Sequence, residues 1–366
     1  MDLVKFVDTD PLLYESQLIL AYENITQRTL NPADPERLMI NLLTYVLTVI
    51  SINIDYAGRM NLISTAQNDY LDKLGELFGC IRLPTQKSKT TIRFFVSSTL
   101  SFDVTIPQNT RVATDNDNYF YTLYEAKILA GNLYTDVQAE FFQAGSLGNN
   151  FAIGQVNKLI DVIPYISSVH NITMSMYGTD IEDDQRYRER IKMSLNSFST
   201  AGPKSSYIYH TKSAHQDISD VSVWSNIPGQ VNISFLLKNG QIPDNTMLTL
   251  VSSYLNDDKI RPLTDTVIIQ APNVINYNIN LTYYIEKDFL PTQSNIHSQV
   301  NHKINDFVSW TKKLGRDILP EKLTDFIMSI YGIHSLDILS PSKTSVENYQ
   351  VAFPQNISYS YGGVKE

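Results

Sequence analysis

The chain has 366 residues, of which 43% are apolar and 18% are charged, and its formal net charge is −9. Its length predicts about two to four domains, and its apolar content, with 22 tyrosines and 15 phenylalanines, excludes an intrinsically disordered chain. Because the chain is acidic and carries no basic stripe, we expect no direct nucleic-acid partner.

Residues 10 to about 80 predict helices. Asp10-Pro11 and Asp34-Pro35 each place a capping side chain before a proline at the first helical position, and Asn31-Pro32 marks a break between the two helices. A further short helix is expected over residues 69–79, where Gly79 can close it.

The second of these helices, residues 38–54, is unusual because apolar residues cover most of its circumference. Exposing half of them would forfeit on the order of 10 kcal/mol, at roughly 1.5–3 kcal/mol each, which equals the stability of a typical domain. The helix must therefore be covered, either by its own chain or by helices of other subunits. A membrane span is disfavoured, since the run is shorter than ~20 residues and contains polar residues. Its polar positions form one narrow stripe: Asn41, Thr44, Thr48, Ser51 and Asp55.

A small β-domain follows and is expected to end near residue 175. Its candidate strands are residues 91–96, 104–106, 119–124 and 134–142, the last with the alternation of a half-buried strand.

A helix is then expected after Gly178-Thr179, with Asp180 as its cap. Glu182 and Asp184 lie four residues before Arg186 and Arg188, a spacing that favours a solvated helix.

The rest of the chain predicts two α+β units. The order strand 221–224, strand 231–237, helix 244–255 and strand 266–270 favours the first. A long strand at 274–285, helices at 293–313 and 320–330 and a strand at 333–339 form the second, and the tail with Tyr359 and Tyr361 either pairs or frays. The fold class is thus α+β and multidomain, with a helical region (1–85), a β-domain (86–175) and α+β domains at 176–273 and 274–366.

Motifs for chemistry are missing from the sequence. The six histidines include two pairs that are five apart, a spacing that turns the rings away from each other on a helix. There is no nucleophile elbow and no phosphate loop, and Cys80 has no charged neighbour in sequence. We therefore expect no catalytic residue, no metal site and no cofactor, and the protein is not expected to be an enzyme. No secretory signal is visible at the N-terminus, so we expect synthesis in the cytoplasm.

A series of short segments occurs in an order typical of one known family. The segments are Asn31-Pro32-Ala33-Asp34-Pro35, Ala66 to Gly75, Ile81 to Pro84, Ile106 to Val112, Gly145 to Asn149, Gly178 to Ile191, Arg261 to Asp265, and Trp310 with Leu314-Gly315. With these segments the chain resembles the baseplate J-like family, the wedge subunits of contractile phage tails and phage-tail-like bacteriocins. Asn68 and Asn109 stand where the family usually has glycine, and asparagine tolerates a positive φ. Tyr177 replaces the first residue of a usual glycine pair.

The resemblance implies a structural role in the baseplate of a virion or of a released tail-like particle made in a bacterial cytoplasm. Two copies would pair with a smaller wedge protein through bundled N-terminal helices, and wedges would join around the hub through C-terminal domains. The expected partners are thus a second copy, the smaller wedge protein, the sheath initiator, hub or spike proteins and neighbouring wedges. Firing would rearrange wedge contacts and couple to sheath contraction. The residues expected at the bundle interface are Leu38, Leu42, Tyr45, Val46, Val49 and Ile52.

Two other functions stay open. A receptor-binding or fibre protein usually shows repeats and long β-rich stretches, so the helical opening argues against it. A cell-wall hydrolase with a dispersed site would need a pocket in which carboxylates of raised pKa converge.

Overall fold

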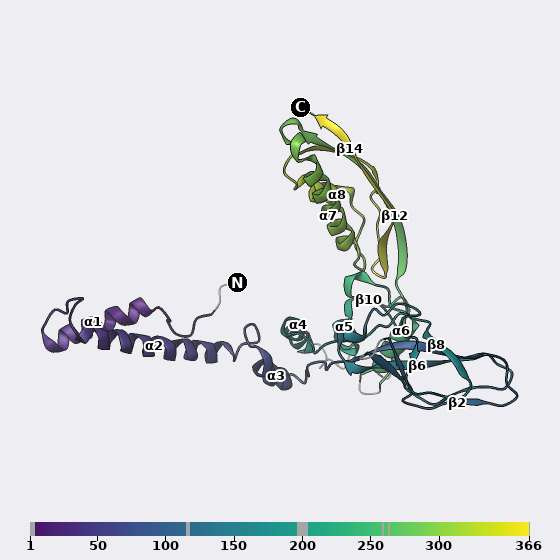
Figure 1. Ribbon diagram of the computed structural model, residues 1–366. Coiled ribbons are helices and arrows are strands. Elements are labelled where there is room, and N and C mark those ends of the chain that lie inside the picture. The colour runs from purple at the N-terminus through teal and green to yellow at the C-terminus, as the bar shows by residue number, and fades with distance from the viewer. Residues whose placement is uncertain (1–3, 115–117, 196–203, 258–259, 263, 366) are drawn as a thin grey trace. The chain divides into compact units, whose positions relative to one another are not determined.

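The computed structural model describes residues 4–114, 118–195, 204–257, 260–262 and 264–365 (Figure 1). Leu263, in one of the family-like segments, lies outside these residues. The chain divides into two compact units. The helical unit runs to Arg82 and includes Asp183–Lys192, and the main unit comprises Leu83–Glu182 and the chain from Met193 onward.

The helical unit begins with a helical hairpin. Its helices are α1 (Pro11–Thr26), α2 (Glu36–Arg59), α3 (Asn68–Leu77) and most of α4 (Asp184–Ser194). The predicted cap of α1 is confirmed, since the Asp10 carboxylate accepts a hydrogen bond from the Leu12 N–H at 2.9 Å. The predicted Asp34 cap of α2 is wrong. The Asp34 carboxylate instead accepts from the Asn31 N–H at 2.9 Å and pairs with Arg28 at 3.0 Å, and α2 starts without a side-chain cap.

The region around α4 corrects two predictions. Asp180 does not cap a helix, because its carboxylate accepts hydrogen bonds from Ser146, while Asp183 accepts from the Arg186 N–H at the start of α4. The helix is also not solvated. Tyr187 is 1% exposed and donates its hydroxyl to the Cys80 carbonyl at 2.6 Å, and Arg190 is 2% exposed. Helix α4 is therefore part of a core, in which burial overrides the charge spacing.

The β-domain of the main unit has a six-stranded sheet in the order β7-β3-β4-β6-β1-β8 and a two-stranded sheet β2-β5. All four predicted strands are present, and four short ones were not predicted because two to six residues carry too little periodicity. Their side chains enclose one core around Phe94, Phe120 and Phe141. The strands are β1 (Lys87–Val96), β2 (Val104–Ile106), β3 (Arg111–Ala113), β4 (Tyr119–Thr122), β5 (Ala126–Ile128), β6 (Tyr134–Ala144), β7 (Lys158–Leu159) and β8 (Ile166–Asn171).

The central part of the main unit confirms the predicted strand-strand-helix-strand order. Its sheet has the order β11-β10-β9, with β10 parallel to β11 and antiparallel to β9. Strand β10 is central, and Ser234 and Leu236 on one face are as buried as Ile233 and Phe235 on the other. Helix α5 was not predicted. The elements are α5 (Lys204–Ala214), β9 (Ile218–Trp224), β10 (Gln230–Leu237), η3 (Lys238–Gly240), α6 (Asn245–Leu255) and β11 (Thr266–Ile269).

The C-terminal part is a three-stranded sheet, β13-β12-β14, with α7 and α8 on one face (Figure 1). The tail does not fray, since it forms β14 and pairs in parallel with β12 along most of its length. These elements confirm the predicted α+β multidomain class, while the four domain boundaries remain a prediction. The elements are β12 (Asn273–Glu286), η4 (Lys287–Thr292), α7 (Gln293–Thr311), α8 (Pro320–Met328), β13 (Ile333–Ser340) and β14 (Gln350–Lys365).

Candidate assembly surface

The seam between α1 and α2 is polar. The Tyr14 hydroxyl lies 2.7 Å from the Ser51 Oγ, and Arg37 donates to the Glu15 carboxylate at 2.8 Å. Of the α2 side chains, Ile40, Thr44, Ser51 and Asp55 are buried, and three of these belong to the predicted polar stripe. Helix α2 therefore turns most of its polar stripe toward its own chain, with α1 lying along it (Figure 1).

Asp55 anchors this seam near the end of α2. Its Oδ1 accepts a hydrogen bond from the Phe6 N–H at 2.8 Å, and Arg59 pairs with the same carboxylate one turn later. The Phe6 N–H, and after it the Arg59 guanidinium, lower the pKa of Asp55 from its ordinary value, although burial opposes them. Phe6 also packs on Gly58, where a Cβ atom would lie 2.5 Å from the ring. The segment before α1 is thus fixed to α2 by one charge and one close contact.

The apolar side of α2 points away from α1. The six predicted interface residues lie within an arc of about 120°, at ~100° per residue, and form one continuous row. Each is exposed, from 39% for Val49 to 73% for Leu38. The row consists of Leu38, Leu42, Tyr45, Val46, Val49 and Ile52.

A second exposed row of α2 side chains extends this surface, and it was not among the residues predicted to form an interface. It adjoins the first row, so that together they cover more than half of the helix circumference. Helix α1 adds Leu12, Leu20 and Ile25, each at least 60% exposed. The described part of the chain therefore does not supply the cover that α2 requires. We call both α2 rows together the apolar face; the second consists of Met39, Leu43, Leu47, Ile50 and Ile54.

Helix α2 has the length and composition of a membrane span, at 24 residues. The prediction that the segment is too short was wrong, because the helix continues on both sides of the apolar run. One such helix is weak evidence for a membrane, and polar residues remain within it.

Residues with potential chemistry serve structural contacts elsewhere. The Glu182 side chain is fully buried and accepts from the Leu83 N–H at 3.0 Å, and Cys80 is buried. Within the described residues, no cluster of three or more histidine, cysteine or acidic side chains is arranged to hold a metal ion.

Tyr177 has a φ of 72°, in the left-handed region that favours glycine, and Asn68 and Asn109 also have a positive φ. The next residue, Gly178, exchanges two hydrogen bonds with the Asn149 amide at 2.7 and 2.8 Å. Burial, and after it the nearby Asp244 carboxylate, raise the pKa of the Tyr177 hydroxyl.

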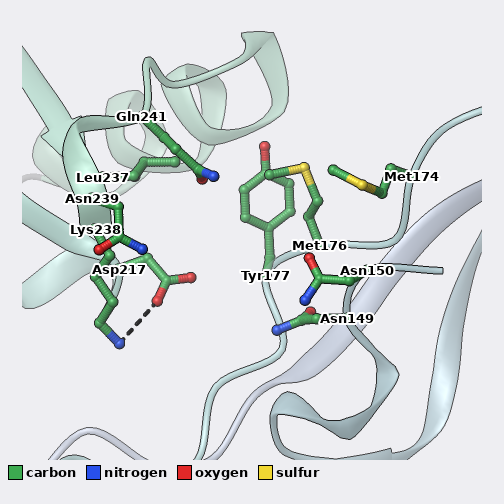
Figure 2. A pocket seen from close by; sticks show the side chains of 10 residues that line it. All are labelled: Asn149, Asn150, Met174, Met176, Tyr177, Asp217, Leu237, Lys238, Asn239 and Gln241. Atoms are coloured by element: carbon green, nitrogen blue, oxygen red, sulfur yellow. Dashed lines mark ion pairs between the residues drawn. The ribbon is translucent and has the colours of Figure 1, made fainter. Parts of the chain in front are cut away.

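The ring of Tyr177 lies between two small cavities of about 130 and 150 Å³. Figure 2 shows Met174, Met176 and Tyr177 across the first cavity from Asp217 and Lys238, which form an ion pair of 3.1 Å. Titratable side chains line both cavities, with Asp217 and Lys238 in the first and Lys89 and Asp244 in the second.

Comparisons with known proteins match one family along the main unit. Models of the Baseplate J-like protein barrel domain, the Baseplate J-like central domain and the Baseplate J-like protein C-terminal domain match residues 91–178, 199–271 and 277–360. The helical unit's first 82 residues lie outside these matches.

Individual relatives agree with the family. Baseplate protein J of Escherichia phage P2 is 30% identical over 171 residues, which are 46% of this chain and 55% of that protein. The alignment thus spans about half the length of that relative. A cryo-EM structure of the anti-feeding prophage baseplate, six-fold symmetrised, is 12% identical with a TM-score of 0.45 over 94% of this chain and 90% of that one. That likeness is too distant to support an argument about function.

Proposed function

This chain belongs to the baseplate J-like family, a family of structural baseplate proteins, and we propose that it is a wedge subunit of a contractile-tail baseplate. Its role is structural rather than catalytic. The observation that carries the proposal is α2, whose apolar face is exposed although Thr44, Ser51 and Asp55 of its polar stripe are buried. A helix of this kind is stable in water only when other helices cover it.

The apolar face gives the proposal its energetics. Each apolar side chain that is fully removed from water contributes about 1.5–3 kcal/mol. If six side chains are each half removed from water, their burial contributes about 5–9 kcal/mol. This contribution offsets part of the entropy that two chains lose on association. The occupants we propose are α2 of a second copy and a helix of a smaller wedge protein.

The main unit has a separate role in the proposal. Its C-terminal α+β domain, residues 274–366, joins neighbouring wedges around the hub, and the sheath initiator sits on the resulting ring. Firing then moves rigid domains against each other and couples the baseplate to sheath contraction. Identical wedge contacts in extended and contracted particles would contradict this coupling. The particle assembles after synthesis in a bacterial cytoplasm, and the boundaries 1–85, 86–175, 176–273 and 274–366 are part of the same proposal.

The test is sedimentation of the tagged chain in a lysate of producing cells, with electron microscopy of the heavy fraction. We expect co-migration with contractile tails and label at the end distal to any head. A slow, monomer-sized species that is absent from every tail would contradict the proposal. Flotation of the chain with lipid vesicles, in place of co-migration, would assign α2 to a membrane instead.

A further inference from the structure

Strand β14 forms one edge of the C-terminal sheet, and this edge is open. Among the described residues its only strand partner is β12, which pairs with it in parallel over residues 350–365. The stretch 355–364, which we call the open edge, contains no charged residue and no proline, and most of its residues are exposed. Every second residue of a strand directs its N–H and C=O groups to the outer side, so the open edge presents backbone groups to which a further strand can bond.

The opposite edge of the same sheet is protected against such an addition. Strand β13 has 8 residues, whereas β14 has 16. It carries His334 and Asp337 as exposed side chains, and Pro341 follows directly after it. Short strands, charged side chains and proline all discourage the pairing of an edge with a further strand. Since the open edge has none of these three features, it is the side on which this sheet can grow.

The open edge also leaves an apolar layer of the sheet incomplete. The buried row of β12 lies against α7 and α8, and the side chains paired with it on β14 lie on the same face of the sheet. Tyr359 and Tyr361 pack against this core but are only partly buried, and Ile357 is 40% exposed. A strand added beside β14 would therefore extend the backbone ladder and cover this row at the same time. The β14 row is Ile357, Tyr359 and Tyr361, paired with Ile279, Leu281 and Tyr283 of β12.

We propose that a second copy of this chain supplies the added strand, and that two β14 strands pair in antiparallel across a two-fold axis. Two such edges complement each other, because an uncharged edge meets an uncharged edge and an apolar row meets an apolar row. The axis is perpendicular to the sheet, so α7 and α8 of both copies cover the same face of one continuous sheet. That this dimer joins neighbouring wedges rests on the proposed function, whereas the pairing itself follows from the open edge.

The apolar row fixes the register of the two strands. Residues that face each other in an antiparallel pair lie on the same side of the sheet, so the axis must lie level with one residue and not between two neighbours. An axis level with Tyr359 is the one that places the whole row of one copy opposite the row of the other, with Ile357 facing Tyr361. On the other side of the sheet, Ser358 then faces Ser360 of the second copy.

The first test uses the full chain with Leu42→Glu and Val46→Glu, because these charges prevent association through the apolar face. Sedimentation equilibrium over a range of concentrations should show a reversible dimer. Adding Ser358→Lys with Ser360→Lys should weaken this dimer about tenfold, since lysines of the two copies then face each other. The matched control is Asn278→Lys with Asn280→Lys, at exposed positions of β12 on the same side of the sheet, and it should leave the dimer unchanged.

A pair of cysteine variants tests the register without adding charge. Chains with Ser358→Cys are mixed with chains that carry Ser360→Cys and are oxidised mildly, and the buried Cys80 adds no background. In the proposed register the Cβ atoms at positions 358 and 360 of the two copies are about 5 Å apart, whereas positions 358 and 358 are about 7–8 Å apart. Disulfides between the two kinds of chain should therefore form about tenfold faster than disulfides between like chains.

Three results would overturn the inference. They are a monomer at every concentration, a dimer that the β14 lysines weaken no more than the β12 lysines, and disulfides that form no faster between the two kinds of chain than between like chains. A monomer whose place in tails is lost only with the β14 lysines would give the open edge to a strand of another protein.

These outcomes are separate from those for the proposed function. A chain that dimerises through β14 but is absent from tails would sink the proposed function while the pairing stands. A chain that is found in tails but fails the three tests would sink the pairing alone.

Discussion

Helix α2 and strand β12 both carry a row of apolar side chains on one face, but the two rows have opposite surroundings. The β12 row, from Tyr277 to Ile285, lies against α7 and α8 and is at most 7% exposed. The α2 row, from Leu38 to Ile52, is at least 39% exposed, while three residues of the polar stripe of the same helix are buried. Periodicity thus identifies an apolar face in each case, but only the structure tells whether the chain itself supplies the cover.

The largest effect is expected for two charges placed on the apolar face. Leu42→Glu with Val46→Glu should remove about 3–6 kcal/mol of association free energy, because two apolar side chains no longer leave water. The stability of the isolated chain should change little. Sedimentation of tails from producing cells measures the loss. Leu147→Glu with Val162→Glu, at exposed positions of the β-domain, is the control and should assemble normally.

A matched pair of truncations compares the two rows directly. Leu281→Ala in β12 should lower the free energy of unfolding of the main unit by about 2–5 kcal/mol, because it leaves a cavity in a packed core. Leu42→Ala in α2 should change the stability of the isolated chain by less than about 0.5 kcal/mol. Urea unfolding measures both. A similar cost for the two substitutions would mean that α2 is buried within its own chain.

The polar seam predicts a smaller effect. Ser51→Ala removes the hydrogen bond to the Tyr14 hydroxyl and should cost the α1–α2 hairpin about 0.5–1.5 kcal/mol. Amide hydrogen exchange of α1 measures it, with Ser16→Ala on the outer side of α1 as the control. Unchanged protection of α1 would show that the seam is not what holds it to α2.

Acidification is expected to have the smallest effect on the hairpin. The pKa of Asp55 is lowered in the folded chain, so its contribution to stability is complete above the ordinary value of 3.8 and is lost as the pH falls through the folded pKa. We expect the segment around Phe6 to loosen only below about pH 4. Circular dichroism and tryptic accessibility after acid exposure would follow it, and Asp55→Asn should remove the pH dependence. Loosening that begins near neutral pH would contradict this assignment.

Much of the fold could be predicted because its long elements carry full periods. The alternation from Tyr277 to Ile285 correctly predicted the buried face of β12, and Asp10 before Pro11 correctly predicted the start of α1. Strands such as β7, with two residues, are too short for any period to appear. The two predicted helix caps Asp34 and Asp180 were wrong for the same reason. Their carboxylates accept hydrogen bonds from Asn31 and Ser146, and sequence spacing alone does not reveal these partners.

The candidate site could be predicted in part. The six residues of the first row were predicted to form an interface because they are apolar at helical spacing. The structure places them on one exposed face of α2, and their role as an interface remains a prediction. Ser51 is buried against α1, and Asp55 is buried against the segment that precedes α1. This burial could not be predicted, because it depends on single hydrogen bonds between residues that are 37 and 49 positions apart in the sequence.

The central claim is that the apolar face is covered by other protein chains in the assembled baseplate. Leu42→Cys tests it most directly, because the only native cysteine, Cys80, is buried and adds no background. Maleimide labelling of this variant should be rapid in the monomeric chain and strongly suppressed in purified tail particles. Labelling at the same rate in both states would contradict the account.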